Sequence, residues 1–266
     1  MRQNTYIIIG DNAMAKNLYH NISEVKTQDM VELIGIHGYG KLGKAVLDLV
    51  GEGACVIDPA VEDVSGSICV HNVQDMATRP DVIIDFSVSE ATEDLLRFAV
   101  DKMVPLVIAT TGHTLKQQAA IKEAAMHIPI FYCANLAATM PTFLAACRMF
   151  AERMQGARIR VHEIHRAQKK DAPSGTAKMI ANVLSEASGK RGWVLGPSTN
   201  DAYVGITYER EGDVVGVHCV TFDNGEESIS LKHEAKDRHV FARGALKAAM
   251  FVLNNPAGLY DWEDMK

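Results

Sequence analysis

The pattern of apolar and polar residues divides the chain near its middle. Between residues 31 and 132, short apolar runs rich in Val and Ile alternate with stretches of helical periodicity. Such alternation is typical of βαβ units, so we predict an α/β domain with a doubly wound, mostly parallel sheet. The expected strands are Val31–His37, Ala54–Ile57, Val82–Phe86, Leu106–Thr110 and Ile128–Tyr132, and the expected helices are Lys41–Leu49, Glu90–Asp101 and Leu115–Ala125.

After residue 135 the strands become longer and alternate between apolar and polar residues. The turn sequence Asp223-Asn224-Gly225 indicates a hairpin. We therefore predict a second, α+β domain with an open, mainly antiparallel sheet. Its expected elements are the helices Pro141–Met154 and Gly175–Ala187, a loop at Ser188–Asp201, and the strands Arg158–His165, Val204–Glu209, Val214–Phe222 and Ser228–Ala235. The last helix, Val240–Leu253, has no strand left to pair with and is expected to pack on the first domain.

These patterns give four segments. Residues 31–134 form the first domain, 135–237 the second, and 238–266 return to the first, with hinges near Ala134–Asn135 and Arg238. Residues 1–30 are an N-terminal extension of uncertain role. The strand-like Tyr6–Gly10 and the helical Asn12–Ile22 either add a βα unit to the sheet or form an appendage, and we favour the appendage.

Composition narrows the classes of function. The chain has 266 residues, of which 47% are hydrophobic and 23% charged, as in ordinary globular proteins. With 27 basic and 33 acidic residues, its net charge of −6 disfavours binding to nucleic acid or an anionic membrane. Five scattered cysteines and the lack of a signal-peptide pattern favour a cytoplasmic protein. The uncharged stretch Ile128–Cys147 contains Pro129, Asn135 and Pro141, so we expect a strand, a turn and a helix start rather than a membrane span.

A glycine-rich turn follows the first strand of the first domain and opens a helix. Its residues are Gly38, Tyr39, Gly40, Lys41, Leu42 and Gly43. In a Rossmann-like fold, these glycines permit the tight turn, the approach of a pyrophosphate and close helix–strand packing, and the helix N-terminus attracts phosphate. Asp58, at the end of the next strand, can accept hydrogen bonds from ribose hydroxyls. The alternative is a simple glycine turn beside a surface aspartate.

Small polar residues follow two other strands of the same sheet. Ser87 comes after Val82–Phe86, and Thr110, Thr111 and Gly112 end the run that starts at Leu106. At the ligand edge of a parallel sheet they would line the nicotinamide and its ribose. Alternatively, the hydroxyl groups cap the helices that follow.

Cations and a histidine gather where the strand Arg158–His165 ends. Arg166, Lys169 and Lys170 lie within five residues, and Ser174-Gly175-Thr176 opens a helix. Cations beside a helix N-terminus suit a carboxylate or phosphate, and His165 can donate a proton. His162 and His165 should point to opposite faces of the strand, so no metal site is expected. The alternative is a solvated cationic loop.

The run from Glu163-x-His165 through Lys169 to Asp171-Ala-Pro-Ser-Gly-Thr176 resembles the signature of the dihydrodipicolinate reductase family. The likeness extends over residues 31–266 and includes the segments Asp85-Phe86-Ser87, Ala109-Thr-Thr-Gly112, Ala134-Asn135, Gly212-x-x-x-Gly216-x-His218 and Phe241-Ala-x-Gly-Ala245.

The resemblance implies a two-domain homotetramer, associated through the sheets of its substrate domains. It would transfer a hydride from NADH or NADPH to 4-hydroxy-tetrahydrodipicolinate, a cyclic imine dicarboxylate of lysine and diaminopimelate biosynthesis. His165 would be the general acid and Lys169 its cationic partner, while Ser174, Gly175 and Thr176 would grip a carboxylate. The glycine turn and Asp58 would hold the dinucleotide, with Thr110, Gly112, Ala134 and Asn135 near the nicotinamide.

Two features of the sequence bear on the substrate and the cofactor that the resemblance implies. Arg166 stands where the family usually has a second histidine, which suggests either another small acid as substrate or a dinucleotide-binding regulator without catalysis. For the cofactor, Asp58 followed by Pro59 favours the ribose hydroxyls of NADH, whereas Lys41 could reach the 2′-phosphate of NADPH. We expect both cofactors to work, with NADH modestly preferred.

Overall fold

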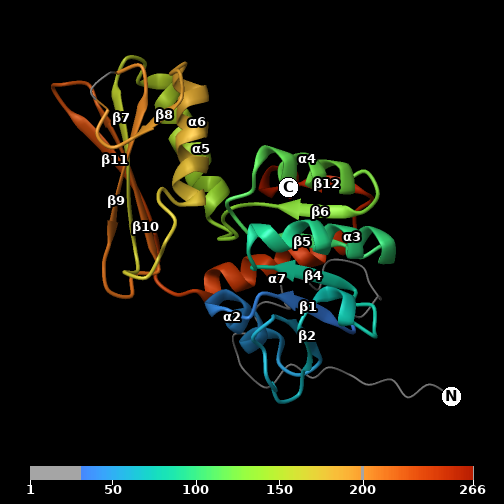
Figure 1. Ribbon diagram of the computed structural model, residues 1–266. Coiled ribbons are helices and arrows are strands. Elements are labelled where there is room, and N and C mark those ends of the chain that lie inside the picture. The colour runs from blue at the N-terminus through green and yellow to red at the C-terminus, as the bar shows by residue number, and fades with distance from the viewer. Residues whose placement is uncertain (1–30, 199–200, 266) are drawn as a thin grey trace, which may run out of the picture. The chain divides into compact units, whose positions relative to one another are not determined.

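The computed structural model describes residues 31–198 and 201–265, which form two compact units (Figure 1). Of the described residues, the first unit contains 31–133 and 241–265, and the second unit contains those between Ala134 and Val240. The strand at Tyr6–Gly10 and the helix at Asn12–Ile22 expected from the sequence lie outside the described residues.

The first unit contains a seven-stranded sheet in the order β12-β6-β5-β4-β1-β2-β3, and every neighbouring pair is parallel. The prediction of a doubly wound α/β fold is therefore confirmed. Its strands are β1 (Ile34–His37), β2 (Ala54–Ile57), β3 (Ile68–Val70), β4 (Val82–Asp85), β5 (Leu106–Ile108), β6 (Pro129–Tyr132) and β12 (Gly258–Tyr260). The helices are α2 (Lys41–Val50), α3 (Thr92–Lys102), α4 (Leu115–Ala124) and α7 (His239–Leu253), with short 3₁₀ turns at Val73–Asp75, Ser89–Ala91 and Trp262–Asp264.

The order of the strands reverses between β1 and β4. From β1 the chain builds outward through β2 to β3, and it then restarts at β4 on the other side of β1. Ligands of doubly wound sheets bind outside the carboxyl ends of the strands at such a reversal. The segments containing Gly38 and Ser87 follow β1 and β4, so both lie at this point of the fold.

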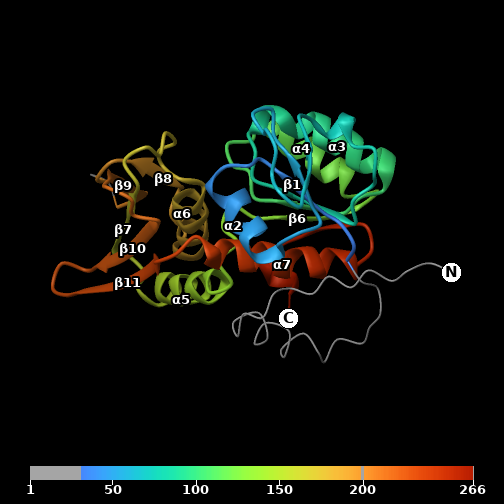
Figure 2. The same ribbon diagram turned by 90° about the horizontal axis from the view of Figure 1, so that it is seen from below.

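Helices cover both faces of this sheet, which explains why β2 and β4 are buried at every position. Figure 2 shows α3 and α4 on one face and α2 and α7 on the other. Ile83 and Ile108 of the sheet pack in one cluster with Leu95 of α3 and Ile121 of α4. Strands buried on both faces are continuously apolar, as this sequence shows.

The short strands β3 and β12 were not predicted from the sequence. Each has three residues, and periodicity does not identify a run that short. β12 pairs with β6, so the expectation that no strand remains after the last helix is wrong. From Phe241 onward, α7 belongs to the first unit.

The second unit contains a five-stranded sheet in the order β11-β10-β7-β9-β8. Helices α5 and α6 pack on it, joined by a core that includes Cys147, Val161, Ile180 and Phe222. The elements are α5 (Met140–Arg153), β7 (Arg158–His165), α6 (Gly175–Ser188), β8 (Trp193–Leu195), β9 (Val204–Arg210), β10 (Gly216–Asp223) and β11 (Ser228–Ala235).

This second sheet is mixed, so the prediction of a mainly antiparallel sheet is corrected. The pairs β11–β10 and β10–β7 are antiparallel, but the pairs β7–β9 and β9–β8 are parallel. The reason is that α6 returns the chain across the sheet after β7, so that β8 and β9 start from the same end as β7. β8 lies within the segment that was expected to be a loop. The predicted hairpin turn is present between β10 and β11, where Gly225 has a φ of 93°.

The apolar stretch Ile128–Cys147 forms β6 and the first part of α5, as its prolines indicated. Among the described residues, no helix is both long and apolar enough to cross a membrane.

Candidate functional site

The glycine turn of the first unit has the geometry that its sequence predicts. Gly38 has a φ of 91°, and a Cβ there would lie 2.7 Å from the amide nitrogen of Ser87. A Cβ on Gly43 would lie 2.1 Å from the carbonyl oxygen of Gly38, so the contact between α2 and the turn requires glycine. A Cβ on Gly40 would meet nothing within 4 Å. The backbone at Gly40 is therefore open to a ligand.

The N-terminus of α2 suits an anion. Gly40 is the N-cap and provides no side-chain cap, and the first turn, which Lys41 and Leu42 begin, contains no acidic residue. The first N–H groups of a helix lack intrahelical acceptors, and the helix dipole favours negative charge there. This end of α2 can thus bind a phosphate.

Asp58 is fixed beside the turn, at the end of β2. Its Oδ2 accepts a hydrogen bond from the amide of Tyr39 at 2.7 Å, and its Oδ1 accepts one from the amide of Ala60 at 2.9 Å. A carboxylate has about four lone-pair sites, so both oxygens can accept further bonds from ribose hydroxyls. The geometry agrees with the role predicted for Asp58.

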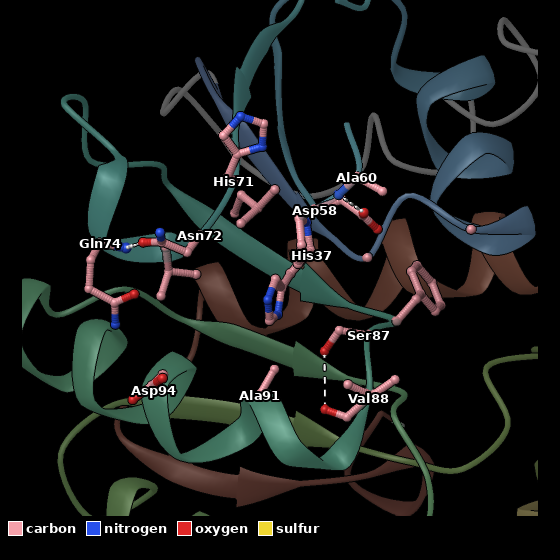
Figure 3. A pocket seen from close by; sticks show the side chains of 16 residues that line it. His37, Asp58, Ala60, His71, Asn72, Gln74, Ser87, Val88, Ala91 and Asp94 are labelled. Carbon is pink, nitrogen blue, oxygen red and sulfur yellow. Dashed lines mark hydrogen bonds between the residues drawn. The ribbon is translucent and has the colours of Figure 1, made fainter. Parts of the chain in front are cut away.

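A cavity of about 480 Å³ lies at this edge of the sheet (Figure 3). That volume is in the usual range for a small-molecule site. Of the predicted cofactor residues, Gly38, Gly40, Asp58 and Ser87 line it, whereas Tyr39, Lys41, Leu42, Gly43, Thr110 and Gly112 do not. His71 and Asn72, which follow β3, line it as well. Sequence reasoning missed these two because it missed β3.

A buried, hydrogen-bonded pair of side chains, His37 and Asp85, lies at this edge of the sheet. His37 Nδ1 is 2.8 Å from Asp85 Oδ1, which also accepts a 2.5 Å hydrogen bond from the hydroxyl of Ser87. Burial by itself would raise the pKa of Asp85, but the hydrogen bonds from His37 and Ser87 hold it below its ordinary value. Asp85 is therefore ionised, and it fixes Ser87 against the cavity.

The hydroxyl groups after β4 and β5 do not cap the next helices. Thr114 is the N-cap of α4, in a capping box with Gln117. Thr110 is buried at the end of β5, and Gly112 has a φ of 87° with open space around its Cα. At Gly112 there is therefore room for a ligand beyond the carboxyl end of β5.

In the second unit, β7 places Glu163 and His165 on one face, because side chains two apart on a strand point the same way. Both are buried, whereas His162, which points the other way, is half-buried. His165 Nδ1 lies 3.4 Å from Glu163 Oε2, and His218 of β10 brings its Nε2 to 3.6 Å from the same oxygen. The two imidazole rings meet edge to face, with their centroids 5.1 Å apart.

The N-terminus of α6 is attached to this cluster. The Ser174 amide donates to Glu163 Oε1 at 3.0 Å, and the Ser174 hydroxyl accepts from the amide of Ala177 as the helix cap. The Thr176 hydroxyl accepts from Asn135 Nδ2 at 3.1 Å. Three residues were predicted to grip a carboxylate. The amide of one of them, Ser174, already donates to Glu163, and its hydroxyl already caps the helix. Gly175 and Thr176 lie in the first turn, where N–H groups lack intrahelical acceptors.

Arg210 of β9 connects the cationic loop to the same carboxylate. Its Nη2 lies 3.3 Å from Glu163 Oε1 and donates to the carbonyl of Asp171 at 2.6 Å, while its Nε donates to the carbonyl of Lys169 at 3.3 Å. The Lys169 ammonium in turn lies 2.7 Å from Asp171 Oδ1. Arg210 therefore holds the loop that carries the predicted cationic partner.

Charge and burial set the protonation of the cluster. Burial would raise the pKa of Glu163, but the nearby His218 and the hydrogen bond from Ser174 lower it to about 2. Burial and the neighbouring His218 lower the pKa of His165 to about 4, although Glu163 acts in the opposite direction. At neutral pH Glu163 is thus charged and His165 is neutral.

Sequence reasoning about a metal considered the wrong pair of side chains. The group whose ligand atoms lie within 4.8 Å of one another is Glu163, His165 and His218, not His162 with His165. The guanidinium of Arg210 already supplies positive charge to the same carboxylate, which disfavours a metal ion there.

The sequence analysis brought His165, Lys169 and Ser174 to one place, and the structure does as well. It missed Glu163, Arg210 and His218 as parts of the site. The Glu163-x-His165 spacing on a strand was a usable signal, whereas β9 and β10 are too distant in sequence to connect to β7. Arg166 is half-buried at the start of the loop. Ala134, predicted as the last residue of the first domain, belongs to the second unit, and Asn135 belongs to the second unit as predicted.

Comparison with known proteins matches both units. The family model described as "Dihydrodipicolinate reductase, N-terminus" matches residues 32–136, and the one described as "Dihydrodipicolinate reductase, C-terminus" matches residues 139–265. The 4-hydroxy-tetrahydrodipicolinate reductase of Caldanaerobacter subterraneus subsp. tengcongensis is 37% identical over 252 residues, covering 89% of this chain and 98% of the relative. The Campylobacter lari enzyme of the same name is 35% identical over 242 residues, covering 87% and 97%.

Solved structures show the same fold. The dipicolinate-bound dihydrodipicolinate reductase of Paenisporosarcina sp. TG-14 superposes with a TM-score of 0.67 at 20% identity, covering 87% of this chain and 98% of that one. The myo-inositol 2-dehydrogenase of Lactobacillus plantarum gives a TM-score of 0.58 at 10% identity, covering 85% and 89%.

Proposed function

Because this chain belongs to the dihydrodipicolinate reductase family, we propose that it reduces 4-hydroxy-tetrahydrodipicolinate to tetrahydrodipicolinate with NADH or NADPH. The observation that carries the proposal is the cluster in the second unit. There a buried histidine, a lysine loop and the N-terminus of α6 gather around one carboxylate, Glu163.

This cluster suits a dicarboxylate. The amides of Gly175 and Thr176 offer hydrogen bonds at a helix N-terminus, and Lys169 and Arg166 add positive charge. Lys169 is only 19% exposed, so its charge is less screened than that of a surface lysine. We propose that these groups bind the two carboxylates of the substrate.

His165 is proposed as the proton donor. With its pKa near 4 it is neutral in the isolated chain at pH 7, and a neighbouring anion raises the pKa of an imidazole. Binding of a dianionic substrate would therefore favour the uptake of a proton from water by His165, since the negative charge of the substrate stabilises the imidazolium. Lys169 would stabilise the negative charge that develops during reduction.

The first unit is proposed to hold the dinucleotide. The open backbone at Gly40 and the N-terminus of α2 suit the pyrophosphate, and Asp58 suits the hydroxyls of a ribose. When bound, the reduced nicotinamide supplies the hydride. We propose that Thr110, Gly112, Ala134 and Asn135 lie near its ring.

For cofactor choice we propose that both dinucleotides work and that NADH is modestly preferred. Asp58 would repel a 2′-phosphate, and Pro59 beside it cannot bind one. Lys41 at the turn partly offsets this repulsion, because an exposed ion pair contributes only about 0–1 kcal/mol.

We further propose a homotetramer in the cytoplasm. The sheet of the second unit exposes Tyr208 and Ile229, and none of the five cysteines, which all lie within the described residues, forms a disulfide. Light scattering after size-exclusion chromatography tests the proposed assembly.

The proposed reaction is tested by following the oxidation of each reduced dinucleotide with freshly generated 4-hydroxy-tetrahydrodipicolinate. Oxidation that depends on this substrate is the expected result. Tight dinucleotide binding without turnover would instead favour a regulator that has lost catalysis.

A further inference from the structure

The side chain of Glu163 is completely buried, and the reaction proposed above gives it no chemical step. A buried carboxylate is costly unless it is paired and hydrogen-bonded. The two oxygens of Glu163 face different partners, and these partners indicate the function of the buried carboxylate.

The oxygen Oε1 holds two parts of the site. It accepts the amide of Ser174, which fixes the first turn of α6, and it lies 3.3 Å from Arg210 Nη2. Arg210 also binds the carbonyls of Lys169 and Asp171. One oxygen therefore sets the position of the helix N-terminus and, through Arg210, of the lysine loop.

The oxygen Oε2 faces the two histidines. It lies 3.4 Å from His165 Nδ1 and 3.6 Å from His218 Nε2, yet neither Glu163 Oε2 nor His165 Nδ1 forms a hydrogen bond. Unpaired buried polar atoms are rare, and each requires an explanation. Hydrogen bonds of catalytic groups are often long in an empty site and shorten in the complex.

Gly216 of β10 completes the arrangement. A Cβ at this position would lie 3.2 Å from His165 Nε2, so glycine leaves the imidazole the space it occupies. The ring is thereby held with Nδ1 toward Glu163 and Nε2 toward Gly216. A carboxylate beside one ring nitrogen places a proton there and leaves the other nitrogen to do the chemistry.

We propose that Glu163 is the positioning residue of this site, which orients His165 through Oε2 and aligns α6 and the lysine loop through Oε1. It also provides the counter-charge for the protonated imidazole, and the gap between Oε2 and Nδ1 closes to a hydrogen bond when His165 is charged. This inference rests on the proposed function insofar as His165 is the acid.

The first test compares the pH dependence of kcat for the unmodified protein and Glu163→Gln. Without the counter-charge, the pH above which kcat falls should move down by about 1–3 units, the range over which an opposite charge shifts a pKa. At the optimum, kcat should fall by about 10²-fold, as expected when a catalytic group is misplaced by about 1 Å. Glu163→Asp keeps the charge. In this variant the high-pH limb of the profile, the range over which kcat falls, should return toward its original position.

The matched control is Glu209→Gln on β9. The Glu209 side chain is 63% exposed. The variant removes one negative charge, as Glu163→Gln does, from the residue next to Arg210. Its pH limb should stay in place. A limb that does not move in Glu163→Gln, or that moves equally in Glu209→Gln, would overturn the proposal.

Arg210→Lys separates the two oxygens. Lysine keeps the charge beside Oε1 but cannot bind both loop carbonyls at once. We expect KM to rise several-fold, since Lys169 loses its fixed position, while the pH limb remains in place. A shift of that limb as large as in Glu163→Gln would contradict the separate roles of Oε1 and Oε2.

A measurement on the unmodified protein tests the proposal even if the variant Glu163→Gln does not fold. ¹⁵N NMR of the imidazoles, recorded with and without dipicolinate as a dicarboxylate probe, should show His165 gaining a proton and Nδ1 becoming hydrogen-bonded. A His165 that binds no proton when the site is saturated with dipicolinate would overturn the proposal. So would stoichiometric metal that a chelator removes together with dipicolinate binding, because Glu163 would then be a metal ligand.

These readouts distinguish the two proposals. If the unmodified protein does not turn over 4-hydroxy-tetrahydrodipicolinate, the proposed reaction fails, but the NMR signal of His165 still reports on Glu163. If turnover is present and the pH limb is insensitive to Glu163, only the positioning role fails.

Discussion

The two units differ in the groups that form the candidate site of each: backbone groups in the first unit and side chains in the second. In the first unit the part of the edge beside α2 is backbone: the glycine turn and the open N-terminus of α2 lie next to Asp58 and a cavity of about 480 Å³. In the second unit the edge is made of side chains, where Glu163, His165, His218 and Arg210 lie within 4 Å of a neighbour in the cluster. The contrast follows from what each edge is proposed to do.

Backbone N–H groups at a helix N-terminus suit a phosphate, because they donate hydrogen bonds to it, carry partial positive charge and do not titrate. Proton donation needs the opposite, a group whose pKa the surroundings can move. Burial and the neighbouring His218 lower the pKa of His165 to about 4. Burial acts in the opposite direction on Glu163, but the nearby His218 and Ser174 lower its pKa to about 2. The first edge can therefore be open, whereas the second must be buried and densely paired.

The largest effect should come from removing the proton donor. His165→Ala should lower kcat by about 10²–10⁴-fold, the usual contribution of general acid catalysis, and leave dinucleotide affinity nearly intact. Steady-state kinetics and a fluorescence titration with NADH measure the two quantities. Lys169→Ala should impair turnover and also weaken substrate binding. Unchanged turnover in His165→Ala would refute the assigned mechanism.

The next effect concerns the contact between the glycine turn and α2. Gly43→Ala places a Cβ 2.1 Å from the Gly38 carbonyl oxygen and should destabilise the protein by about 1–3 kcal/mol, as overpacking does. Dinucleotide affinity should fall, while dipicolinate binding persists. Gly40→Ala, with open space around it, is the control for stability. Equal melting temperatures for the two variants would show that α2 can shift without cost.

Arg166 tests how the second edge recognises its ligand. If it binds a carboxylate, Arg166→Ala should raise KM by about 10- to 10²-fold, in line with about 1.5–3 kcal/mol for a charged hydrogen bond, and lower kcat less. Arg166→His should recover part of the loss. Lys170→Ala, at an exposed neighbouring position, controls for loss of loop charge. Unchanged kinetics in Arg166→Ala would place Arg166 outside the site.

The smallest effects should be on cofactor choice at the first edge. Lys41→Ala should reduce the use of NADPH selectively, and Asp58→Ala should narrow the gap between the cofactors. Each effect should be about fivefold or less, because exposed charge pairs contribute about 0–1 kcal/mol. His71→Ala asks whether this histidine, which lines the cavity, also serves NADPH. A strong preference for NADPH in the unmodified protein would show that a cation rather than Asp58 governs the ribose site.

The sequence by itself determined the features that depend on local geometry. The turn from Gly38 to Gly43 and the strand–helix alternation need only neighbouring residues, so their positions could be predicted to within a few residues. The motif from His165 to Thr176 lies in one loop and helix start, and for the same reason it could be read directly from the chain.

Only the tertiary structure decided what surrounds that motif. Arg210 and His218 reach Glu163 because β9 and β10 flank β7, and strand order is set by long-range packing rather than by local sequence. The same holds for β3 and β12, which are strands only because β2 and β6 offer them backbone hydrogen bonds. The buried charge of Glu163 likewise has no local signature, since burial depends on the sheet and helices that enclose it.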